Sequence, residues 1–246
     1  TYVVCRRLVF LSGGITHASF GGIGMAYYFG ANPLLGALLF AVLSALGIET
    51  FTARKQIRED SAIGLLWSLG MAIGIIFIYL TPGYAPNLMS FLFGNILSVT
   101  GTDIFWMGVV DLAILLIFGT MYHPILFVAF DREYARSQNF PTRTISYLMA
   151  TLVAVTIVIS IRVVGIVLLI SLLTIPAVIG NLISKSFGRI LLYGSVIAAL
   201  SAFAGLYISY QTNIPSGAST IFVLTVTLIA VKTITFVRLK RRMKTR

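Results

Sequence analysis

One histidine, His17, lies inside the first full-length apolar segment of the chain. The hydroxyl residues Ser12, Thr16 and Ser19 are spaced by four and three positions, so a helix would line them up as a polar strip beside the imidazole. An imidazole inside a membrane is costly unless it faces a polar interior, and it is a good ligand for zinc or manganese. The strip could therefore line a path for such a cation, with His17 as the metal ligand.

A helix-packing seam is the alternative interpretation of the same strip. Gly13 and Gly21 lie at helical spacing from His17 and leave room for a neighbouring helix, whose carbonyl the imidazole could bond. A stable protein metal site needs three or four ligands, and this segment offers one histidine. The sequence favours the packing interpretation and keeps the metal path as the competing one.

Other polar residues within apolar segments are few. Asp111 could face a substrate pathway, whereas Glu49 is expected at the cytoplasmic interface. The pair His123-Pro124 predicts a kink near a helix end, and Pro176 predicts either a tolerated kink or a break that exposes a carbonyl to a cavity. No nucleophile elbow, paired histidines or phosphate-binding lysine loop is present, so we expect no catalytic residues and no enzymatic activity.

A stretch just past the midpoint is the longest polar interruption of the chain. Asp131 can cap a short helix there, with Glu133 in its first turn and Arg136 nearer its negative end. Asn139 tolerates a left-handed backbone at the helix end, and Pro141 prevents the helix from restarting. Such a surface helix is suited to docking a partner, and an amphipathic helix lying among lipid headgroups is the alternative.

The whole composition is that of a polytopic membrane protein, because 58% of the 246 residues are hydrophobic and 10% are charged. Residues 88–100 are apolar but too short to cross, and we predict a re-entrant or interfacial helix there. Windows of about 20 residues predict an all-α transmembrane bundle of eight spans, at 12–29, 31–52, 61–80, 104–129, 143–161, 163–184, 188–210 and 217–237.

The net charge of +11 comes from basic residues that are concentrated in the loops between the predicted spans and in the C-terminal tail. Basic residues fall in alternate loops, the loops between them carry no charge, and Arg162 alone lies on the wrong side. The positive-inside rule therefore places the Arg132 to Arg143 loop in the cytoplasm. The basic excess orients the chain against anionic lipid and does not indicate nucleic acid.

Several stretches, in order along the chain, resemble the membrane permeases of bacterial ABC importers for zinc, manganese or iron. The similarity is collinear from about Val4 to Lys232. The matching stretches are Thr16-His17-Ala18, Arg58 to Gly64, Leu92-Phe93-Gly94 with Asp103, Phe130-Asp131-x-Glu133-x-Ala135, Val164-Gly165 through Pro176-Ala177, and Pro215 to Ser219.

The resemblance implies a fold like that of the vitamin B12-type importers and a single permease domain over residues 1–246, without the native N-terminal span. It also implies a homodimer in the bacterial inner membrane, a cytoplasmic ABC ATPase that uses ATP, and an extracytoplasmic metal-binding protein. No cofactor is expected on this chain itself. Residues 131–141, with Ala135 at the family's alanine position, would form a cytoplasmic coupling helix that sits in a cleft of the ATPase and turns its closure into movement of the spans.

Two positions depart from the family pattern. Gly13 stands where the family commonly has an aspartate, four residues before the histidine, so one carboxylate is missing from that helix face. Asn139 replaces the usual glycine of the coupling loop, and both residues tolerate the same backbone.

The sequence thus favours a permease subunit for a divalent metal ion, with zinc first and manganese or iron as alternatives. An ion channel or secondary transporter without an ATPase is the runner-up, although ion coupling would more naturally use additional buried carboxylates. An intramembrane enzyme is the third hypothesis.

Overall fold

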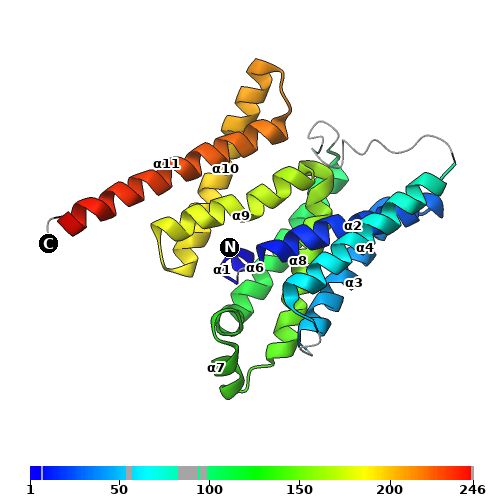
Figure 1. Cartoon of the computed structure of the whole chain (residues 1–246), viewed down its shortest axis with the longest axis horizontal. Coiled ribbons are helices and arrows are strands. Elements are labelled where there is room, and N and C mark those ends of the chain that lie inside the picture. Colours follow the sequence, from blue (N-terminus) through cyan, green and yellow to red (C-terminus); the bar gives the residue numbers. More distant parts are fainter. Residues whose placement is uncertain (7, 54–56, 83–93, 95–98, 245–246) are drawn as a thin grey trace. The chain divides into compact units, whose positions relative to one another are not determined.

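The structure is a computed structural model that describes residues 1–6, 8–53, 57–82, 94 and 99–244 (Figure 1). Within these residues all regular secondary structure is helical, as predicted. The helices are α1 (Tyr2–Cys5), α2 (Val9–Tyr28), α3 (Pro33–Ala53), α4 (Glu59–Leu80), α6 (Gly101–Phe130), α7 (Arg132–Ser137), α8 (Thr142–Val164), α9 (Ile166–Ile183), α10 (Phe187–Thr212) and α11 (Ser216–Lys244).

Each of the eight predicted spans corresponds to one of these helices. Seven of the described helices are long and apolar enough to cross a membrane, and α2 is not among them. Although α2 has 20 residues, its glycines, hydroxyls and histidine dilute its apolar character. The predicted interfacial helix at 88–100 falls almost entirely outside the described residues.

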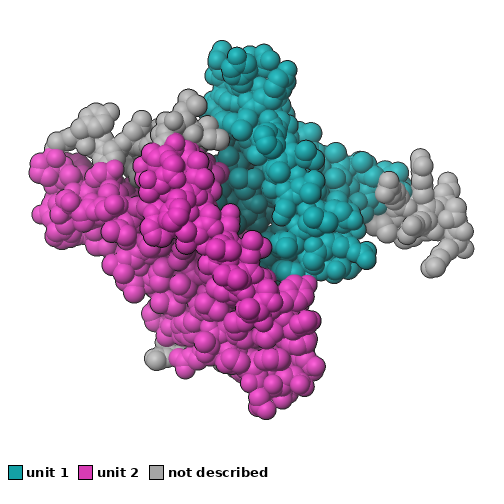
Figure 2. Space-filling model, turned by 180° about the vertical axis from the view of Figure 1, so that it is seen from behind, with its two compact units in different colours: residues 1–5, 167–246 teal, residues 6–166 magenta. Residues whose placement is uncertain are grey.

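Two compact units make up the chain, and Figure 2 colours them separately. The larger unit is residues 6–166 and contains α2, α3, α4, α6, α7 and α8. The smaller unit joins residues 1–5 to residues 167–246. In the smaller unit α10 and α11 pack together where Gly205 meets the backbone and hydroxyl of Thr220, and Asn213 ends α10 in a left-handed conformation.

Helix α2 is the packing centre of the larger unit and contacts α3, α4 and α8 (Figure 1). A Cβ on Gly22 would collide with the backbone of Gly36 in α3. A Cβ on Gly21 would lie 2.8 Å from the carbonyl oxygen of Gly70 in α4. Glycine lets these helices approach backbone to backbone, which is a common way for membrane helices to associate.

Helix α6 begins at a capping box, in which the Thr100 hydroxyl accepts from the Asp103 N–H while the Asp103 carboxylate accepts from the Thr100 N–H. Its helical geometry is interrupted at Met121 (φ −116°, ψ 24°), three residues before Pro124. Proline removes a backbone donor and clashes with the preceding turn, so this interruption confirms the predicted kink.

Candidate functional site

The polar stretch predicted as a docking helix forms α7, a single short helix between α6 and α8. The Asp131 carboxylate accepts a 2.9 Å hydrogen bond from the Tyr134 N–H, which confirms Asp131 as the cap. Asn139 has φ 59°, the left-handed conformation predicted for the helix end. Pro141 then precedes α8, so both ends of α7 form as predicted.

One face of α7 is anchored and the other is exposed. Ala135 is fully buried, and the Phe127 ring of α6 lies 5.3 Å from the Tyr134 ring and 5.8 Å from the Phe140 ring. Glu133 and Arg136 are exposed. The helix therefore presents charged side chains from a fixed position, which is what a docking surface requires.

An ion pair joins α7 to α3. The Arg132 guanidinium lies 3.2 Å from the Glu49 carboxylate, and the two side chains are 29% and 14% exposed. Glu49 is therefore close to α7, which lies in the loop that the positive-inside rule predicts to be cytoplasmic. The pairing itself was not predicted, because it joins residues 83 positions apart and neither residue has a local pattern that names its partner.

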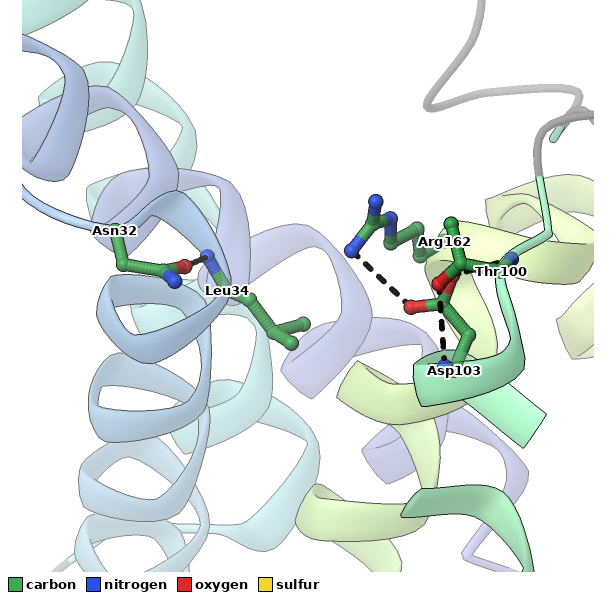
Figure 3. Close-up of polar contacts among 5 residues, drawn as sticks. All are labelled: Asn32, Leu34, Thr100, Asp103 and Arg162. Carbon is green, nitrogen blue, oxygen red and sulfur yellow. Dashed lines mark hydrogen bonds and ion pairs between the residues drawn. The ribbon is translucent and has the colours of Figure 1, made fainter. Parts of the chain in front are cut away.

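A second ion pair lies at the opposite end of α8 (Figure 3). The Arg162 guanidinium is 3.1 Å from the Asp103 carboxylate, whose second oxygen accepts a 2.7 Å hydrogen bond from the Thr100 hydroxyl. Arg162 is the residue that departs from the positive-inside pattern. The nearby carboxylate compensates its charge, which gives a physical reason for the exception.

A cavity of about 430 Å³ lies beside Arg162, among α2, α3 and α8. Figure 3 shows Asn32 and Leu34 at the start of α3 on the other side of this region. The residues that line it include no carboxylate, imidazole or thiol that could bind a metal cation. This cavity is therefore a poor candidate for the cation path.

The hydroxyls of the predicted polar strip are bonded within α2. Thr16 donates to the Ser12 carbonyl at 2.6 Å, Ser19 donates to the Thr16 carbonyl at 2.6 Å, and Ser12 donates to the Val9 carbonyl at 2.8 Å. All three side chains are buried. These contacts support the packing interpretation for Ser12, Thr16 and Ser19.

His17 stacks on the Trp67 ring of α4, with the ring centroids 4.3 Å apart and the planes 7° from parallel. A Cβ on Gly13 would lie 3.8 Å from the same indole. Trp67 therefore also lies beside the position where the permease family described above commonly has an aspartate. Among the described residues, no three His, Cys, Asp or Glu side chains lie close enough together to hold a metal ion. In this chain His17 is thus a single candidate ligand beside an aromatic ring.

Asp111 lies on the exposed side of α6, apart from the α2 strip. An open surface hollow of about 560 Å³ adjoins it and is lined by Val99, Ile104, Met107, Gly108, Asp111 and Val163. No ion pair is found for Asp111 among the described residues. A carboxylate within an apolar span is a candidate for a cation path, because lipid is an unfavourable environment for its charge.

Comparisons with known proteins agree with this architecture. The family model of the ABC 3 transport family matches residues 1–235. A probable metal transport system membrane protein of Chlamydia pneumoniae is 37% identical over 223 residues, covering 88% of this chain and 76% of that protein. A manganese transport system membrane protein, MntC, of Halalkalibacterium halodurans is 33% identical over 222 residues, covering 90% of this chain and 76% of that protein.

A solved structure is also similar, that of PsaBC from Streptococcus pneumoniae in complex with Fab. Its matching chain has a TM-score of 0.81 and is 28% identical, and the alignment covers 94% of this chain and 83% of that one. The all-α membrane bundle is therefore a fold that this sequence shares with an experimentally determined structure.

Proposed function

Because this chain belongs to the ABC 3 transport family of metal-ion permeases, we propose that it carries a divalent metal cation across the bacterial inner membrane. The permease subunit of an ABC transporter is not itself catalytic. Under this proposal ATP is hydrolysed by a separate cytoplasmic ATPase, and an extracytoplasmic binding protein delivers the metal. A second copy of the permease completes the membrane part.

The geometry of α7 is the observation that carries the proposal. It is a capped polar helix between two long apolar helices, anchored through Ala135 and Phe127 and presenting Glu133 and Arg136. A permease driven by a separate ATPase needs such a feature, whereas a channel or secondary transporter does not. We propose that residues 131–141 are the coupling helix and that they insert into a cleft of the ATPase.

For the cation path we propose His17 and Asp111, one on α2 and one on α6. Imidazole and carboxylate are suitable ligands for zinc, manganese and iron. The Thr16-His17-Ala18-Ser19 and Leu92-Phe93-Gly94 stretches resemble the zinc branch of the family, while the similar protein of Halalkalibacterium halodurans is named for manganese transport. Because Gly13 provides no carboxylate on α2, ion identity is best decided by direct measurement with all three metals.

The test is reconstitution of the permease with its ATPase and binding protein in proteoliposomes. We expect uptake of radioactive manganese, zinc or iron that requires ATP on the side of the membrane where the ATPase is bound. This uptake should stop when Glu133 and Arg136 are both replaced by alanine. A matched variant, Ser137→Ala, changes an exposed neighbour without a charge and should transport like wild type. Metal flux that continues without ATP would contradict the importer function and favour a channel or secondary transporter.

A further inference from the structure

We infer that the ion pair between Arg132 and Glu49 transmits the movement of α7 to α3 and, through α3, to the helix that carries His17. Arg132 and Glu49 are positioning residues in this account, and neither contacts the transported cation. The inference rests on the proposed function and specifies how ATPase closure would reach the membrane helices.

Two kinds of contact hold α7, and they lead to different parts of the bundle. The aromatic contacts of Phe127 join α7 to the end of α6, which directly precedes it in the chain. The Arg132–Glu49 pair joins α7 to α3, a helix remote in sequence. Of the two, only the ion pair connects α7 to a helix that is distant from it in the sequence.

The surroundings of the pair make it a specific contact. The Arg132 Nε is buried without a hydrogen-bond partner among the described residues, so the guanidinium is held mainly through its terminal nitrogen. The Glu59 carboxylate, at the start of α4, lies within Coulombic range of Arg6, Glu49 and Arg132. Charged groups from α3, α4 and α7 therefore lie near one another at one end of the larger unit, and Arg132 and Glu49 form the ion pair among them.

Helix α3 can pass a displacement on because it packs against α2 through backbone. Gly22 of α2 and Gly36 of α3 meet without intervening side chains, and so do Gly21 of α2 and Gly70 of α4. The Phe40 side chain of α3 also packs against Gly21 and Gly22. Because the backbones themselves are in contact, little space is left for α3 to move without α2. A shift of α3 therefore moves α2 and changes the setting of His17 against Trp67.

If the pair is broken, α7 stays attached to α6 through Phe127 and to α8, which packs on α3, but it loses its direct contact with α3. The ATPase would still bind the exposed face of α7 and hydrolyse ATP, while less of its movement would reach α2. The expected consequence is uncoupling, which means a lower number of metal ions transported per ATP.

The experiment uses Glu49→Gln, Glu49→Arg, Arg132→Glu and the charge swap Glu49→Arg with Arg132→Glu, each in the full complex. Copurification with the ATPase, ATP turnover and uptake of manganese and zinc are measured together. For Glu49→Gln we expect copurification and ATP turnover within about twofold of wild type and metal ions per ATP reduced about fivefold or more. The swap should recover about half of the wild-type ratio or more, because it restores attraction between the same positions.

Two control variants separate coupling from other effects. Glu133→Gln lies on the exposed face of α7 and should lower copurification itself, while Arg162→Gln breaks the ion pair at the far end of α8 and should leave the ratio of metal to ATP unchanged. A wild-type ratio in Glu49→Gln, or a charge swap that is no better than its single variants, would overturn the inference and leave the importer function standing. Absence of ATP-driven uptake in the wild-type complex would instead overturn the proposed function, and this inference with it.

Discussion

In helix α2, 14 of the 20 residues are buried, whereas in the longer helix α6 the buried residues are four of 30. Both helices contain glycine, but its surroundings differ. Gly21, Gly22 and Gly24 of α2 press against the backbone of neighbouring helices, while Gly108 and Gly119 of α6 have open space where a Cβ would be. The glycine surface of α2 is thus covered by other helices of the same chain, whereas Gly108 and Gly119 of α6 are not covered.

The open surface of α6 has a defined composition. Ile104, Gly108, Asp111, Leu115 and Gly119 follow one another at spacings of four, three, four and four, so they lie on one face of the helix. Placing the Asp111 carboxylate against lipid would cost about 2.5–3.5 kcal/mol at the membrane centre. Glycine in α2 therefore serves folding of the chain, whereas Gly108 and Gly119 of α6 are available for contact with another protein or with a water-filled path.

The largest expected effect is that of Gly22→Leu. A leucine there must displace the Gly36 backbone, and we expect the free energy of unfolding in detergent to fall by about 3 kcal/mol or more, with loss of folded protein from the membrane. Gly119→Leu is the matched control, because nothing lies near its Cβ position, and we expect a change within about 0.5 kcal/mol. Similar losses of stability in the two variants would remove the distinction between α2 and α6.

Asp111→Asn tests whether the open face of α6 serves transport. The variant removes a charge without changing shape, so we expect unchanged or higher thermal stability of the permease. Metal uptake by the assembled complex should fall about tenfold, which corresponds to about 1.4 kcal/mol in the barrier to passage.

Asp111→Glu is the matched variant, since it retains the carboxylate, and it should keep most of the uptake. If Asp111→Asn transports metal at the wild-type rate, the carboxylate is not part of the path and the open face of α6 has only a packing role.

Substitutions of His17 test whether α2, although densely packed, contributes one ligand to the transported metal ion. We expect His17→Ala to lower uptake about fivefold, a loss of about 1 kcal/mol. His17→Phe can preserve the stack on Trp67 but offers no metal ligand, so we expect the same loss of uptake. Wild-type uptake by His17→Phe together with impaired uptake by His17→Ala would assign the residue to packing alone.

The comparison between the two helices also shows what local sequence could predict. Long apolar segments predicted the helix positions. Asp131 and Asn139 predicted the cap and the left-handed end of α7, because each of these features depends on a few neighbouring residues. The kink before Pro124 is local in the same sense.

Contacts between distant segments could not be predicted in this way. The stacking of His17 on Trp67 and the pairing of Arg132 with Glu49 depend on how the helices cross, and hydropathy gives no crossing angles. The sequence likewise does not distinguish the glycines of α2, which pack against neighbouring helices, from Gly108 and Gly119 of α6, which have open space beside them.

Thr16→Val has the smallest expected effect and is the finest test of the polar strip. The Thr16 hydroxyl donates only to the Ser12 carbonyl, one turn earlier in α2, and that carbonyl can still accept the backbone N–H of the helix. Valine has nearly the same shape, so no cavity forms and no buried partner loses its only hydrogen bond. We expect the free energy of unfolding to change by less than about 1 kcal/mol and metal uptake to remain at the wild-type level. Uptake reduced several-fold with stability unchanged would place this hydroxyl on the cation path beside His17 and contradict the packing interpretation of the strip.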